Sequence, residues 1–105
     1  MAETERMRQL RALLDDDPHD PFLRYGLAME HISAGDDERA VTTFRELLAS
    51  APQYVPTYLM LAQALVRLGR EDEAKVVLGT GVGVAGRVGE LHAQGELQVM
   101  LDSLD

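Results

Sequence analysis

Apolar residues recur at helical spacing in six stretches of this 105-residue chain. Apolar positions three and four apart line one face of a helix, whereas a half-buried strand would alternate apolar and polar positions. Breaker residues separate the stretches, at Pro18, Gly35, Pro52, Gly69 and Gly89. The pattern therefore predicts six helices, over residues 4–16, 21–33, 36–51, 56–68, 71–88 and 90–103.

Residues at the ends of these stretches support the predicted boundaries. Asp20 precedes Pro21, which is a capping carboxylate followed by a proline at the first helical position. Acidic residues at 36–38 and 71–73 suit the positive end of the helix dipole. Gly35 supplies the positive φ that the turn after residue 33 needs.

The first and last helices are each predicted to bury one apolar face. On the first helix that face is Met7, Leu10, Leu13 and Leu14. On the last it is Ala93, Leu97, Met100, Leu101 and Leu104. The residues expected in water on the last helix are Gln94, Glu96, Gln98 and Asp102.

The central stretches repeat with a period of 34 residues. The matched pairs are Leu27 with Leu61, Ala28 with Ala62, Ile32 with Val66, Gly35 with Gly69, Ala40 with Ala74, and Phe44 with Leu78. The same shift also relates Leu10 to Phe44, Leu13 to Leu47, Leu14 to Leu48 and Pro18 to Pro52. A fixed period with matched small, apolar and breaker residues indicates a stacked-repeat protein.

On these residues the sequence resembles the tetratricopeptide repeat (TPR) family, whose unit is a helix–turn–helix of that length. The resemblance implies a single all-α domain, a right-handed α-solenoid of antiparallel helix pairs. Its parts would be an N-terminal helix over 1–18, repeats over 21–52 and 55–88, and a capping helix over 89–105.

Small residues have distinct roles in this interpretation. Ala40 is expected where, in this family, paired helices approach most closely, and Gly81 is the family's small residue in the second repeat. Gly79 and Gly83 also lie inside the helix predicted over 71–88, where each costs about 1 kcal/mol relative to alanine. We therefore expect this helix to fray or bend before Gly89 ends it.

Composition and charge exclude several classes of protein. The chain has no cysteine, which excludes disulfides, thiolate metal sites and cysteine nucleophiles. Its net charge of −8 argues against a nucleic-acid partner. The charged N-terminus and the absence of roughly 18 consecutive apolar residues predict no secretory signal and no membrane anchor. A soluble cytoplasmic protein is expected.

No catalytic, cofactor-binding or metal-binding residue is predicted. The stretch 81–86 matches the dinucleotide fingerprint GxGxxG, but it follows a predicted helix, and too few residues remain for a βαβ unit. His19, His31 and His92 lack ligand spacing, and His31 is expected to be half-exposed. The acidic run 15–17 lacks the spacing of a calcium loop. The sequence thus predicts a protein that is not an enzyme.

The resemblance implies a concave groove that binds a peptide or helix of a partner protein. The family's groove positions correspond to Phe22, Tyr25, Met29, Ile32, Ser33, Pro56, Leu59, Gln63, Val66 and Arg67. The candidate partner-binding residues are Phe22, Tyr25, Met29, Ile32, Leu59, Gln63, Val66 and Arg67. The lysines and asparagines of carboxylate-clamping members are missing, so the groove suits an amphipathic helix or hydrophobic peptide. Homodimerisation through the same apolar surface is the alternative.

Overall fold

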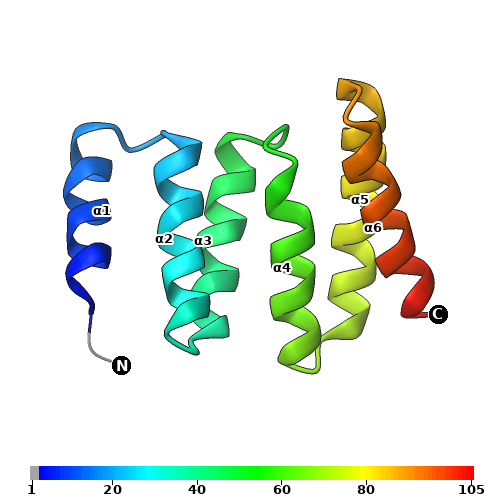
Figure 1. The fold of residues 1–105 in the computed structure, drawn as a ribbon, viewed down its shortest axis with the longest axis horizontal. Helices are drawn as coiled ribbons and strands as arrows, with labels where there is room; N and C mark the ends of the chain where they lie inside the picture. The colour runs from blue at the N-terminus through cyan, green and yellow to red at the C-terminus, as the bar shows by residue number, and fades with distance from the viewer. Residues whose placement is uncertain (1–2) are drawn as a thin grey trace.

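The computed structural model describes residues 3–105, which form six α-helices and no strand (Figure 1). The helices are α1 (Glu5–Asp16), α2 (Pro21–Ser33), α3 (Asp37–Ser50), α4 (Pro56–Arg67), α5 (Glu71–Val88) and α6 (Leu91–Ser103). Every predicted helix is present, with each end within one or two residues of its predicted position.

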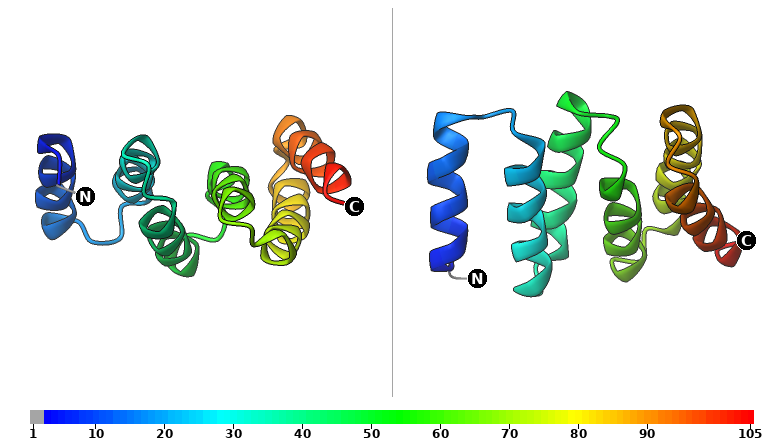
Figure 2. Two further views of the ribbon diagram at one scale, coloured as in Figure 1. Left: turned by 90° about the horizontal axis from the view of Figure 1, so that it is seen from below. Right: turned by 45° about the horizontal axis from the view of Figure 1, so that its top comes forward.

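Successive helices pack against one another, and α6 also touches α4. Helices α2, α4 and α6 lie in one layer and α3 and α5 in the other (left view of Figure 2). The resulting slab measures 38 × 29 × 19 Å. The prediction of an all-α solenoid is confirmed.

Caps and turns fix the helix boundaries as the sequence indicates. The Asp20 carboxylate accepts hydrogen bonds from the backbone N–H groups of Phe22 and Leu23 at the start of α2. Gly35 and Gly69 each have a φ of 76°, and Gly89 ends α5 with a φ of 79°. These left-handed turns reverse the chain between antiparallel helices.

The main core extends without a break from α2 to α6. Its largest fully buried side chains are Phe44, Leu47, Leu61, Leu65, Leu78, Leu97 and Thr57. Helix α1 packs separately, with Met7 and Leu10 against Leu27. Leu13 was predicted on the same buried face but is 51% exposed, because α1 packs on α2 alone and its far side has no neighbour.

Helix α5 is continuous over 18 residues, so the prediction that it would fray or bend was wrong. Tertiary packing offsets the helix propensity lost at its glycines: Gly81 is buried against Tyr58 and Leu97. The expectation that Gln94 faces water was also wrong. Its side-chain amide is half-buried and donates a hydrogen bond to the Val82 carbonyl at 3.2 Å, joining α6 to α5.

Thr57 is fully buried in the first turn of α4, and its hydroxyl has no hydrogen-bond partner among residues 3–105. A buried unsatisfied hydroxyl costs free energy that valine, of similar shape, does not. Thr57→Val is therefore expected to raise the free energy of unfolding by about 1 kcal/mol, measured by urea denaturation. The control is Thr43→Val, since the buried Thr43 hydroxyl donates to the Arg39 carbonyl at 2.9 Å. An equal gain in both variants would contradict the prediction.

Candidate functional site

The face formed by α2, α4 and α6 contains an apolar groove, which we call the α4–α6 groove. It has a volume of about 650 Å³. Its apolar wall consists of Leu59 on α4 and Leu91, Gly95, Val99 and Met100 on α6. A smaller adjoining pocket of about 190 Å³ reaches towards Tyr25 on α2. Leu59 and Glu96 line both, so the two volumes form one continuous depression.

The predicted groove residues do not all lie in this depression. Leu59 and Gln63 line the α4–α6 groove, and Tyr25 lines the adjoining pocket. Phe22 is 71% exposed at the start of α2 and lines neither volume. The half-buried residues that pack against the core instead of lining the groove are Met29, Ile32 and Val66.

Tyr25 belongs to the core as much as to the surface. Its ring centroid lies 5.9 Å from that of Phe44 and 5.6 Å from that of Tyr54, both in tilted contact. Burial raises the pKa of the Tyr25 hydroxyl, and the neighbouring Tyr54 adds to the shift. The hydroxyl is therefore neutral at physiological pH, and Tyr25 forms an uncharged floor for the pocket.

Arg67 is tied to the neighbouring helix. Its Nε and Nη2 donate to the two carboxylate oxygens of Asp37 at 3.0 and 2.9 Å. These hydrogen bonds raise the pKa of the Arg67 guanidinium, against a smaller opposing effect of burial. The bidentate pair joins the end of α4 to the start of α3, so Arg67 fastens the repeats together.

The sequence analysis missed the contribution of α6 to the groove. Leu91 and Val99 are 69% and 71% exposed and face the groove across from Leu59 and Gln63. With Gly95 they recur every four residues, which places them on one side of the helix. That spacing is visible in the sequence, as a second apolar stripe beside the buried stripe that contains Leu97.

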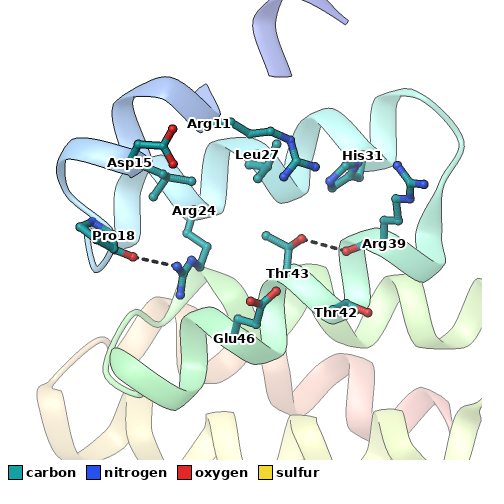
Figure 3. A pocket seen from close by; sticks show the side chains of 11 residues that line it. Arg11, Asp15, Pro18, Arg24, Leu27, His31, Arg39, Thr42, Thr43 and Glu46 are labelled. Atoms are coloured by element: carbon teal, nitrogen blue, oxygen red, sulfur yellow. Dashed lines mark hydrogen bonds between the residues drawn. The ribbon is translucent and has the colours of Figure 1, made fainter. Parts of the chain in front are cut away.

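A second depression lies on the other side of α2, between α1 and α3, and we call it the α1–α3 cleft (Figure 3). Its volume is about 590 Å³, and three arginines, Arg11, Arg24 and Arg39, line it. His31 lies on its floor and is only 3% exposed, so the expectation of a half-exposed histidine was wrong. The reason is that α1 covers this end of α2.

Other candidate chemistry finds no support in the described residues. The GxGxxG stretch 81–86 lies inside α5, so it forms no loop that could surround a phosphate. Across residues 3–105, no three potential metal ligands come together. None of the helices in that range combines the length and apolar character needed to cross a bilayer.

The fold and its open apolar groove define a helical-repeat protein. Comparison with known proteins identifies the family: a tetratricopeptide repeat model matches residues 31–94. A TPR repeat-containing protein of Pseudomonas aeruginosa is 30% identical over 84 residues, which cover 80% of each chain. This chain belongs to the tetratricopeptide repeat family.

Solved structures agree with this assignment. The solution structure of a tetratricopeptide repeat domain protein from Salinibacter ruber is 38% identical, with a TM-score of 0.80 over 84% of this chain and 89% of that one. A crystal structure from the same organism, also 38% identical, gives a TM-score of 0.76 over 81% and 94%. A Bordetella parapertussis protein at 23% identity shares the fold, with a TM-score of 0.81 over 98% and 89%.

Proposed function

We propose that this protein is a non-catalytic interaction module whose α4–α6 groove binds an apolar segment of a partner protein. TPR domains generally bind other proteins, and this domain offers an open apolar groove for the purpose. The observation that best supports the site is the exposure of Leu91 and Val99 beside Leu59 in a chain of net charge −8. Large exposed apolar side chains gathered in one depression are typical of an interaction surface.

The chemistry of the groove favours an amphipathic helix with basic flanks. Its walls are aliphatic and include the adaptable Met100, which suits the apolar face of a helix. Glu96 lines both parts of the depression and Glu90 the adjoining pocket. Lysines or arginines beside the apolar stripe of the partner would face these carboxylates, and the overall negative charge would attract them.

The test uses a synthetic amphipathic helix of about four turns, made of leucine and lysine at a period of 3.6 residues. A scrambled peptide of the same composition is its control. Backbone resonance shifts of the labelled protein are expected to concentrate on α4 and α6 with the first peptide only. Shifts spread over the whole acidic surface, or equal for both peptides, would contradict the proposal.

Two matched variants locate the site. Val99 in the groove is 71% exposed, and Val76 on α5 is 70% exposed. Val99→Asp is expected to weaken peptide binding by about 2 kcal/mol, or about thirtyfold, because it places a charge in the apolar contact. Val76→Asp adds the same charge outside the groove and should leave binding unchanged. If sedimentation shows that the free protein dimerises and Val99→Asp abolishes the dimer, the groove serves self-association instead.

A further inference from the structure

The α1–α3 cleft contains two arginines that face the same buried histidine. Arg11 comes from α1 and Arg39 from α3, and their guanidinium groups lie on either side of His31 (Figure 3). Arg11 pairs with Glu3, and Arg39 with Asp36 at 3.5 Å or less, on the exposed side of the cleft. No carboxylate among residues 3–105 joins the two arginines to each other.

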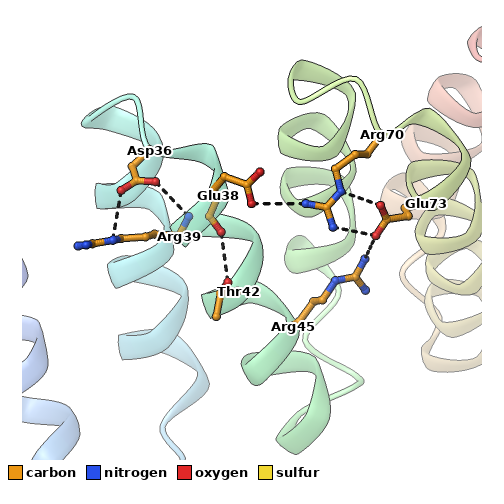
Figure 4. A network of polar contacts seen from close by, with 7 residues as sticks. All are labelled: Asp36, Glu38, Arg39, Thr42, Arg45, Arg70 and Glu73. Atoms are coloured by element: carbon orange, nitrogen blue, oxygen red, sulfur yellow. Dashed lines mark hydrogen bonds and ion pairs between the residues drawn. The ribbon is translucent and has the colours of Figure 1, made fainter. Parts of the chain in front are cut away.

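The second repeat shows what normally occupies this place. A shift of 34 residues converts Arg11 into Arg45 and Arg39 into Glu73. There the Arg45 Nη2 donates to Glu73 Oε1 at 3.0 Å, which links α3 to α5 (Figure 4). An ion pair thus connects the helices in the second repeat, whereas two like charges face each other in the first.

The surrounding contacts correspond closely in the two repeats. The Arg24 guanidinium donates to the Pro18 carbonyl at 2.7 Å, and at the equivalent place the Tyr58 hydroxyl donates to the Pro52 carbonyl at 2.5 Å. Asp36 pairs with Arg39 as Arg70 pairs with Glu73, with the signs reversed. The frame is therefore conserved between the repeats, and the element missing from the first is the carboxylate that would bridge its two arginines.

His31 adds a second, independent feature. It stands where the second repeat has the fully buried Leu65, and a polar ring at this place is costly unless it gains a partner. Its ring nitrogens make no hydrogen bond to another described residue. The charged groups that face it are Arg11 and Arg39, with Asp36 and Glu3 of opposite sign. Burial, then Arg11, lowers the pKa of His31, so the ring is neutral at pH 7.

We propose that the α1–α3 cleft binds a carboxylate side chain of an acidic peptide segment, between Arg11 and Arg39 and above His31. The bound carboxylate would take the place that Glu73 occupies in the second repeat. Guanidinium groups match carboxylate geometry and form short, charge-assisted hydrogen bonds with it. The existing pairs with Glu3 and Asp36 are exposed, and such pairs contribute little stability, so the arginines can share their donors with a ligand.

The remaining charges restrict the ligand. Asp15 and Glu46 line the opposite end of the cleft, beside Pro18 and Arg24 (Figure 3). They would repel a second acidic group a few residues away. The cleft of about 590 Å³ therefore suits a peptide with one acidic side chain among neutral neighbours rather than a polyanion.

Binding should depend on pH through His31. A bound carboxylate favours the imidazolium form, and so it raises the His31 pKa from its lowered value in the free protein. By linkage the ligand binds more tightly when the ring is protonated. Affinity is thus expected to increase as the pH falls through the pKa of His31, for as long as the ligand carboxylate stays ionised.

The experiment uses a capped peptide with a single glutamate among glycines and serines, and its glutamine counterpart, at constant ionic strength. Saturable shifts of the Arg11 and Arg39 Nε–H groups and of the His31 ring are expected with the glutamate peptide only, with a higher His31 pKa in the complex. Equal shifts with the glutamine peptide, or none with either, would overturn the proposal. Tighter binding of inorganic phosphate than of the peptide would also overturn it, because the ligand would then be a phosphate.

Three variants make the assignment specific. Arg39→Glu places a carboxylate opposite Arg11, as in the second repeat, and is expected to weaken peptide binding at least about tenfold. Arg8→Glu makes the same charge change on the outer face of α1 and should not alter affinity. His31→Leu installs the residue found at Leu65, so the fold should persist while the pH dependence is lost. Equal losses in Arg39→Glu and Arg8→Glu, or an unchanged pH dependence in His31→Leu, would refute the site. Neither variant pair touches the α4–α6 groove, so its proposed function is tested separately.

Discussion

Leu61→Ala is expected to lower the free energy of unfolding by about 2–5 kcal/mol. Leu61 is 0% exposed and lies in the middle of α4, in the core that extends from α2 to α6. Removing three buried carbon atoms loses their transfer free energy and leaves a cavity that packed helices on both sides can fill only in part. Urea denaturation followed by circular dichroism measures the change.

Leu59→Ala is the matched comparison, two residues earlier on the same helix. Leu59 is half-buried and lines the α4–α6 groove, so its truncation removes less buried surface and leaves no closed cavity. We expect a loss of no more than about 1 kcal/mol. If Leu59→Ala destabilises the protein as much as Leu61→Ala, Leu59 is a core residue and the groove wall must lie elsewhere.

The sequence predicts the framework because its turns and its period are local. Gly35 and Gly69 adopt the positive φ that the sequence analysis assigned to Gly35, and the 34-residue register places Leu27 and Leu61 in the buried interior. Helix propensity alone misjudged α5. Its glycines weaken the isolated helix, but contacts between Gly81 and the neighbouring helices offset that loss.

The candidate site is harder to predict, because it depends on contacts that the repeat register does not describe. Helix α5 has 18 residues where α3 has 14, so the family's groove positions cannot be transferred to α6 by the 34-residue shift. The pair between Arg67 and Asp37 spans 30 positions in sequence, and neither residue alone indicates it. The burial of His31 depends on α1, whose packing the period predicts only in outline.

The close approach at Gly81 gives a prediction in which the same substitution has opposite effects within one helix. A Cβ atom added at Gly81 would lie 2.7 Å from the Tyr58 Cβ and 3.1 Å from a Leu97 methyl. The Tyr58 Cβ is anchored to the backbone of α4 and cannot move aside, so α4 and α5 would have to separate. Overpacking of this kind costs about 1–3 kcal/mol.

Gly79→Ala is the control, because an added methyl there meets no atom within 4 Å. Alanine favours the helix over glycine, so Gly79→Ala is expected to stabilise the protein by a few tenths to about 1 kcal/mol. Gly81→Ala has the same propensity gain but is expected to destabilise overall, since the steric cost exceeds it. Urea denaturation of both variants under identical conditions gives the comparison. If both stabilise, α4 and α5 are not in contact at Gly81, and if both destabilise, the backbone at Gly79 is not helical.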